Sequence, residues 1–215
     1  GKPQRAQNTL TQQEIDEGWK LLFDGKTLKG WQNCGAWKAE DGTITNIPPE
    51  YGKRTYCYLW TDKPYENYIL SLDFKISREK CNGGIFIRTR NLGNIYTGFE
   101  IQVSDSYGKD ELTYRDCGAL YFTAAPGPNS VKPAGEWNNI VITSNDNIIS
   151  IVNNGVQGAN VDLNGFTTPG KNPDGTDHLF GKHVTLKDFH RVGYIGVQEH
   201  IKPIWYRNIK IKELD

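Results

Sequence analysis

The chain has 215 residues, and its 25 Lys and Arg residues balance 25 Asp and Glu residues, so the formal net charge at pH 7 is zero. A nucleic-acid-binding surface needs basic residues in excess on one face, which argues against nucleic acid as a partner. No stretch approaches the roughly 18 consecutive apolar residues of a membrane-spanning helix, so no membrane span is predicted. The length is typical of one large all-β domain.

Residues 1–17 are expected to form an N-terminal segment with one short helix. Thr11 and Glu14 have the spacing of a capping box, in which each side chain binds a backbone amide at the start of a helix. Gly18 follows as a stop signal. The remainder, residues 18–215, shows no linker and no internal repeat, which predicts a single domain.

After residue 18 the chain consists of short apolar stretches separated by Gly, Asn, Asp and Pro, the pattern of strands and turns. Asp41-Gly42 and Asn154-Gly155 are strong hairpin signals. Strands that are not separated by helical patterns predict a sandwich or a barrel. The expected strands cover residues 19–23, 36–40, 43–47, 56–60, 68–76, 83–90, 97–104, 118–123, 136–144, 148–152, 156–161, 192–198 and 204–212.

Two polar segments rich in Gly and Pro, residues 124–135 and 165–187, interrupt this pattern and are expected to be long loops. Loops of this length in a compact domain are usually functional or disordered.

Residues 98–105 carry the most informative polar pattern. Phe99, Ile101 and Val103 alternate with polar residues and are expected to face the core. Glu100 and Gln102 then share the opposite face, and Asp105 follows at the strand end. A solvated strand face more often carries Thr, Lys or Ser, so this face is expected to bind a ligand rich in hydroxyl groups.

Two further segments carry candidate site residues. In residues 82–88, the alternation places Arg88 on the face opposite Ile85 and Ile87, where it either forms an ion pair with Glu100 or donates hydrogen bonds to a substrate. In residues 193–200, Gln198 and His200 are expected on one face. His200 is either a surface residue or an acid, a base or a metal ligand.

The other histidines and Trp137 are given structural interpretations. His178, His183 and His190 are expected at the surface, and Trp137 is expected to be a core anchor rather than a platform for sugars.

The four cysteines, Cys34, Cys57, Cys81 and Cys117, have neither CxxC spacing nor a nearby His pattern, which argues against structural zinc. Free buried thiols are the favoured state. Disulfides remain open, and four cysteines allow three pairings.

Seven segments, in order, resemble the 3-keto-disaccharide hydrolase domain family, and the resemblance covers about residues 18–214. They include residues 22–31 (LFDGKTLKGW), 82–88 (NGGIFIR) and 98–105 (GFEIQVSD). The others are residues 118–121, 132–138, 196–200 and 206–208. Gly83 stands where the family usually has Ser, a departure expected to influence substrate choice. Asn153 stands where Leu is commoner and is expected to be neutral.

The resemblance implies a concanavalin A-like jelly roll of two antiparallel sheets, one of which holds carbohydrate on a concave face. It also implies an exported bacterial protein, periplasmic or at the cell surface, with a signal segment or lipid anchor upstream of the domain. Gly1 in place of Met agrees with a missing leader.

The implied reaction is cleavage of a glycosidic bond in a sugar oxidised to a ketone at carbon 3. The ketone acidifies the proton on carbon 2, so a base can remove it and the enolate can expel the group on carbon 1. Glu100 or His200 is the expected base. Arg88, or a divalent metal ion held near Glu100 and Asp105, is expected to stabilise the enolate. The residues expected to contact the substrate are Asn82, Gln102, Asp105, Tyr121, Gln198 and Arg207.

Two other functions remain open. A conventional glycoside hydrolase needs two carboxylates on either side of the scissile bond, but Glu100 and Asp105 would lie on opposite faces of a regular strand. A carbohydrate-binding, lectin-like module would need the sheet and its aromatic rings but no base.

Overall fold

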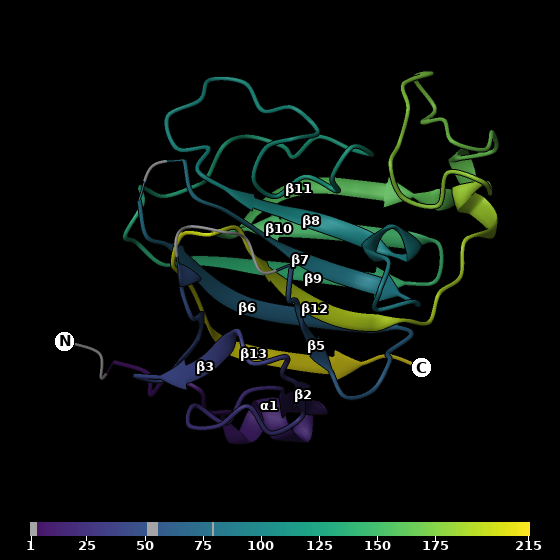
Figure 1. The fold of residues 1–215 in the computed structure, drawn as a ribbon. Helices are drawn as coiled ribbons and strands as arrows, with labels where there is room; N and C mark the ends of the chain where they lie inside the picture. The colour runs from purple at the N-terminus through teal and green to yellow at the C-terminus, as the bar shows by residue number, and fades with distance from the viewer. Residues whose placement is uncertain (1–3, 51–55, 79) are drawn as a thin grey trace.

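The computed structural model describes residues 4–50, 56–78 and 80–215. Within them, two antiparallel sheets pack face to face as an all-β sandwich, with almost no helix (Figure 1). The large sheet has the order β11 (Val156–Asp162), β10 (Ile148–Asn153), β9 (Asn138–Asn145), β6 (Tyr68–Ile76), β13 (Ile204–Glu213), β4 (Thr43–Asn46) and β3 (Trp37–Glu40), and β1 (Trp19–Leu21) also pairs with β13. The small sheet has the order β2 (Trp31–Gln32), β5 (Leu59–Thr61), β12 (Tyr194–Glu199), β7 (Asn82–Thr89) and β8 (Phe99–Ser104).

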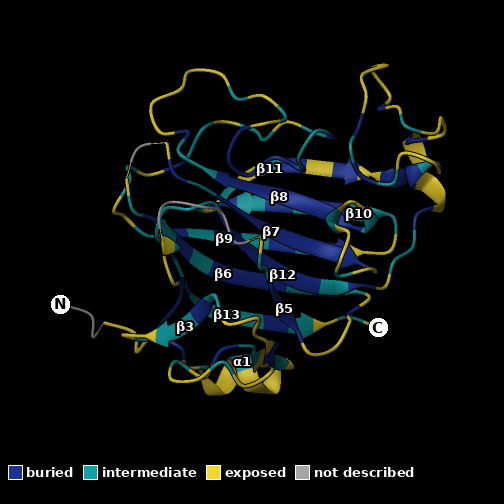
Figure 2. Cartoon of the chain, viewed as in Figure 1, coloured by how far each residue is buried: buried dark blue, intermediate teal, exposed yellow. Residues whose placement is uncertain are grey.

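The core lies between the two sheets, as the alternating pattern of the strands predicts. Phe99, Ile101 and Val103 of β8 are fully buried, and they face the large sheet, where Leu70 and Phe74 of β6 are also fully buried (Figure 2). Removal of these apolar surfaces from water is the main favourable contribution to folding.

Both predicted hairpins are confirmed. Asn154 and Gly155 join β10 to β11, and Asp41 and Gly42 join β3 to β4. All four residues have positive φ, between 49° and 76°. This is the geometry of a type I′ turn, which Asn, Asp and Gly tolerate better than other residues.

The predicted strand at residues 118–123 is not a regular strand. The segment runs beside β8, where the backbone amide of Gly118 donates to the carbonyl oxygen of Gln102 and the backbone amide of Tyr121 donates to the carbonyl oxygen of Glu100. The amides of Thr123 and Ala124 then bond back to Leu120, which turns the chain away. Only a short edge pairing remains, and it places Tyr121 next to Glu100.

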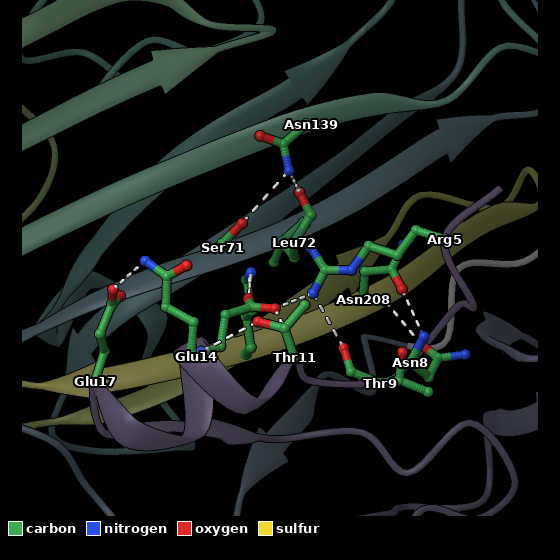
Figure 3. Close-up of polar contacts among 12 residues, drawn as sticks. Arg5, Asn8, Thr9, Thr11, Glu14, Glu17, Ser71, Leu72, Asn139 and Asn208 are labelled. Carbon is green, nitrogen blue, oxygen red and sulfur yellow. Dashed lines mark hydrogen bonds and ion pairs between the residues drawn. The ribbon is translucent and has the colours of Figure 1, made fainter. Parts of the chain in front are cut away.

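The predicted helix is present as α1 (Gln12–Asp16), with the capping box between Thr11 and Glu14. The segment before it lies against the outer face of the large sheet (Figure 3). Asn8 and Asn208 exchange two hydrogen bonds, in which each backbone amide donates to the other side chain at 2.6 and 2.9 Å. Glu14 forms ion pairs with Arg5 and with Lys210 of β13.

These contacts make the stability of the protein depend on pH at Glu14. Burial would raise the pKa of this carboxyl, but the hydrogen bonds from Lys210 and Thr11 and the charges of Lys210 and Arg5 outweigh it and lower the pKa from 4.5 to about 2. A depressed carboxyl pKa stabilises the fold above the unfolded value and loses that effect as pH falls through the folded value.

We therefore expect Glu14→Gln to lower the free energy of unfolding by about 1 kcal/mol at pH 7. The Gln side chain can still accept the capping hydrogen bond, so the loss of stability measures the contribution of the Glu14 charge. The difference between variant and wild type should shrink between pH 4.5 and about 2. Urea denaturation at pH 7 and pH 3 measures it, and a difference that is the same at both pH values would contradict this assignment.

Two structural interpretations are wrong. Trp137 is only half-buried, and the guanidinium of Arg207 lies 3.9 Å from its ring, outside the core. His178 is fully buried because the long loop of residues 165–187 folds back onto the sandwich, where its Phe180 and Leu186 join the core. His190 is half-buried, while His183 is exposed as predicted.

The cysteines divide into two kinds. Cys34 and Cys57 form a disulfide, with their Cα atoms 6.1 Å apart. Cys81 and Cys117 are free buried thiols. The preference for free thiols therefore holds only for the second pair.

Candidate functional site

A cleft of about 520 Å³ lies over the outer face of the small sheet. Its floor is formed by β7, β8 and β12, whose register places Gly84 between Gln102 on one side and Gln198 on the other. The next row along the strands is Glu100, Phe86 and Gly196. Polar side chains from two strands therefore meet across a strand that has no side chain at Gly84.

The absence of a side chain at Gly84 is what allows this convergence. A Cβ at this position would lie 2.5 Å from Oε1 of Glu100 and 2.6 Å from Oε1 of Gln198, closer than real Cβ atoms come to other atoms. Gly196 has the same role for the aromatic part of the floor, since a Cβ there would lie 2.3 Å from the ring of Trp60. Glycine in a strand often marks such a close approach.

The polar floor is buried rather than solvated. Glu100, Gln102 and Gln198 are each only 5–6% exposed. Among the described residues, the side-chain oxygen of Gln102 finds no hydrogen-bond partner. An unpaired buried oxygen costs free energy, and a hydroxyl of a bound ligand would supply the missing donor.

Tyr121 is coupled to Glu100. Burial raises the pKa of its phenol, and the negative charge of Glu100 raises it further. The hydroxyl therefore stays protonated at neutral pH, and it can act as a hydrogen-bond donor or as an acid at this point of the cleft.

His200 is held at the end of β12 by a tight turn. Ile201 has a φ of 75°, which is unusual for a branched residue, and its amide donates to the Glu199 carboxylate at 2.5 Å. The turn directs the chain so that His200 lines the cleft while Glu199 is buried.

Four tyrosines, Tyr56, Tyr58, Tyr96 and Tyr121, give the cleft its aromatic lining. Tyr58 packs edge to face on the buried ring of Phe86 at 5.2 Å, and the ring of Trp60, also buried, lies 5.3 Å from Phe86. Apolar rings beside amide and carboxyl groups form a surface that suits a sugar, which has both apolar ring faces and hydroxyls.

The structure brings six of the nine predicted site residues together. The residues that line the cleft are Asn82, Glu100, Gln102, Tyr121, Gln198 and His200. Arg88, Asp105 and Arg207 do not line it.

Arg88 is on the opposite side of the sheet from the face that the alternation predicts. It has a φ of 54°, and the register of β7 with β12 shifts beside it. This irregularity turns its fully buried side chain toward the large sheet, where Nε donates to Ser144 at 2.8 Å and Nη2 to the Asp146 carbonyl at 2.7 Å. Burial lowers the pKa of its guanidinium to about 10. Neither an ion pair with Glu100 nor enolate stabilisation fits this position.

Asp105 and Arg207 also have other partners. The Asp105 carboxylate accepts from the amide of Lys80 at 3.2 Å and orders the turn before β7. Arg207 belongs to the large sheet, where its guanidinium lies 3.5 Å from Asp73 and stacks on Trp137.

The proposed metal pair of Glu100 and Asp105 is therefore not assembled in one cleft. The part of the chain that the structure describes also contains no group of three or more His, Cys, Asp or Glu residues placed to hold a metal ion. These residues do not fit a divalent cation, and no metal is assigned a role in the mechanism.

Gly83, the residue that departs from the family pattern, faces the core. A Cβ there would lie 2.4 Å from Cδ1 of Ile204 and 3.0 Å from the hydroxyl of Tyr206. The expectation that Gly83 in place of Ser influences substrate choice is therefore wrong, because a side chain at this position would point into the core and Gly84 is the glycine under the cleft.

Sequence reasoning missed Tyr58, Asn94 and Tyr96, which line the cleft from connecting segments. Asn94 caps the short helix η2 (Ile95–Thr97) by accepting from the amide of Tyr96 at 3.1 Å. The run of Asn and Gly at residues 91–94 signals a turn, but strand periodicity gives no information on where such a turn lies in space.

The chain is similar to known proteins over nearly its whole length. Residues 18–212 match the sequence profile of the 3-keto-alpha-glucoside-1,2-lyase-like domain. A 3-keto-disaccharide hydrolase of Bacteroides thetaiotaomicron is 27% identical, over 93% of this chain and 79% of that protein.

Solved structures agree with this match. A protein of Parabacteroides distasonis, described as a candidate glycosyl hydrolase, is 32% identical with a TM-score of 0.78, over 91% of this chain and 99% of that one. A galectin-like protein of unknown function from Bacillus subtilis, 12% identical with a TM-score of 0.51 over 97% and 94% of the two chains, confirms the lectin-like jelly-roll fold. The chain belongs to the 3-keto-alpha-glucoside-1,2-lyase-like domain family.

Proposed function

We propose that this protein is a glycoside-cleaving enzyme that acts on 3-keto-glucosides by elimination followed by hydration. The observation that carries the proposal is the convergence of Glu100 and Gln198 over Gly84 in a cleft with aromatic walls. Membership of the family and the activity named for the Bacteroides relative support the same reaction.

In the proposed mechanism, the Glu100 carboxylate takes the proton from carbon 2 of the keto-sugar. The electron pair of that carbon–hydrogen bond forms an enolate with the ketone at carbon 3, and the enolate then expels the group on carbon 1. The leaving oxygen receives a proton, and His200 or Tyr121 is positioned to supply it. Water then adds across the double bond between carbons 1 and 2, with its hydroxyl on carbon 1.

The remaining polar groups of the cleft would orient the substrate and stabilise the enolate. The side-chain amides of Gln198, Gln102 and Asn82 line the cleft and can donate to the enolate oxygen or exchange hydrogen bonds with ring hydroxyls. These amides take over the stabilisation of the enolate that the sequence suggested for Arg88, because the Arg88 guanidinium is buried between the sheets.

The two alternatives receive less support. Of the described residues that line the cleft, only Glu100 carries a carboxylate, whereas a conventional glycoside hydrolase uses two. A lectin-like fold is compatible with binding alone, and fold alone does not decide function. A binding module would not need a carboxylate buried beside an unpaired amide oxygen, because this combination costs stability.

The test is release of the aglycone from a 3-keto-glucoside, compared with release from the parent glucoside. We expect only the keto form to be cleaved, since only the ketone acidifies carbon 2. In parallel reactions with and without a chelator, we expect equal rates, because the proposed mechanism has no step that uses a metal ion. Equal cleavage of both forms would favour conventional hydrolysis, and binding without cleavage of either would favour a lectin-like module.

We also propose that the protein is exported. The disulfide between Cys34 and Cys57 supports this proposal, because disulfides persist in oxidising compartments and are rare in the bacterial cytosol. The described residues contain no helix that is long and apolar enough to cross a membrane.

A further inference from the structure

A second cleft, of about 670 Å³, lies beside the first one. One side is formed by residues 90–97, and the other by the end of the long loop, residues 179–184, together with Phe189 and His190. Figure 1 shows this loop as the yellow-green projection at the upper right. The two clefts share Asn94 and Tyr96, so a ligand can extend from one into the other.

Tyr96 forms the boundary between the clefts. The residue is 51% exposed, and its ring packs against the ring of Phe180, with the ring centroids 5.5 Å apart. An exposed aromatic ring with a fixed orientation is a platform on which a second ring can stack. Leu179, Val184 and Phe189 give the second cleft an apolar lining.

The titratable side chains of the second cleft, apart from Tyr96, are all basic. Arg90, Lys182, His183 and His190 line it, and no Asp or Glu is among the described residues that do so. Within the described chain, neither Arg90 nor Lys182 has a carboxylate at ion-pair distance, whereas nine other basic residues do: Arg5, Lys20, Lys38, Lys63, Lys109, Lys171, Arg191, Arg207 and Lys210. Two exposed cations beside an apolar surface are available to an anion.

His190 contributes shape rather than charge. Its ring nitrogen Nε2 lies 2.7 Å from the Arg88 carbonyl oxygen, and burial lowers its pKa. The nearby charge of Arg90 lowers that pKa further. Arg90 and Lys182 therefore supply the charge at neutral pH.

We propose that the second cleft is the subsite for the leaving group and that it selects an aglycone with a carboxylate on a ring that has an apolar face. The ring packs on Tyr96 and Phe189, while the carboxylate binds Arg90 and Lys182. The assignment of this cleft to the leaving group, rather than to another part of the substrate, rests on the proposed function. Binding of an acid in the cleft can be tested without any turnover.

The test is binding of free acids and their neutral counterparts, measured by ligand-observed NMR or calorimetry. The ligands are 4-hydroxybenzoate against 4-hydroxybenzamide, and glucuronate against glucose. We expect each bound acid to have a dissociation constant at least about tenfold lower than its neutral counterpart, and the preference to weaken at high salt. The two pairs distinguish an aromatic acid from a sugar acid as the source of the carboxylate.

Arg90→Gln and Lys182→Gln are each expected to weaken binding of the acid about tenfold and to leave binding of the neutral ligand unchanged. Lys187→Gln is the matched control, because it removes the same charge from an exposed residue at the end of the same loop, outside the cleft. Equal affinity for acid and neutral ligand in both pairs, or no effect of either cleft variant, would overturn the proposal.

This design separates the two proposals. Binding of the acids without cleavage of any keto-glucoside would leave the subsite standing and remove the proposed reaction. Cleavage of keto-glucosides with no preference for an acidic aglycone would support the proposed reaction and remove the proposed subsite.

Discussion

Glu100→Gln is expected to lower kcat on a 3-keto-glucoside about a thousandfold, because an amide cannot accept the proton from carbon 2. Gln has nearly the shape of Glu, so the packing of the cleft floor is retained. Circular dichroism and thermal melting check that the fold is intact, and steady-state kinetics give the loss.

Asp105→Asn is the matched control for this variant. It neutralises the other carboxylate of the same strand region, whose side chain orders the turn at Lys80 outside the cleft. We expect kcat to change less than about threefold. A large loss in Asp105→Asn would revive the paired-carboxylate or metal interpretation, and full activity of Glu100→Gln would remove Glu100 from the mechanism.

The second large effect is expected at two adjacent glycines that face opposite sides of the sheet. Gly84→Ala places a methyl group where Oε1 of Glu100 and Oε1 of Gln198 now meet. Both are ends of flexible side chains, so they can move aside at little cost in stability. Their displacement by about 1 Å is expected to lower kcat/KM on the order of a hundredfold.

Gly83→Ala is the contrasting variant. Its methyl group would enter the core between Ile204 and Tyr206, both of which are fully buried and cannot move freely. Overpacking of this kind costs about 1–3 kcal/mol and lowers Tm by about 2–4 °C per kcal/mol. Residual activity per folded molecule should stay near that of wild type.

Melting curves and kinetics are expected to change in opposite ways in the two variants. Gly84→Ala should melt normally and be nearly inactive, while Gly83→Ala should melt early and be active when folded. The opposite assignment, or loss of activity in both without loss of stability, would contradict the orientation of β7 described here.

The regular parts of the fold followed from the sequence. Alternation placed Phe99, Ile101 and Val103 in the core, and the turn residues located both hairpins. Six of the nine predicted site residues share one cleft because they lie on regular strands or beside them, where the period of two holds.

The error at Arg88 has a local physical origin. Arg88 near the end of β7 and Asn208 within β13 have positive φ, and the register shifts beside each of them. One irregular residue reverses the side on which the following residues lie. Alternation predicted the wrong face for Arg88 for this reason, and no local turn signal marks that position.

The contacts that the sequence did not predict are made by loops. Tyr96 and Lys182 meet at the second cleft although they are far apart in sequence, and their loops carry no periodicity that predicts such a contact. The length and composition of residues 165–187 indicated a functional segment, but only the structure shows that the end of this segment lines a second cleft beside the first one.

The central claim is that the bond to the aglycone breaks after Glu100 removes the proton on carbon 2. The most direct test follows a deuterium label on carbon 2 of a 3-keto-glucoside, with immediate borohydride reduction of the product and a control without enzyme for spontaneous exchange. We predict that the wild type releases the aglycone and the label together and that Glu100→Gln releases neither. Release of the aglycone with the label still on carbon 2 would contradict the mechanism.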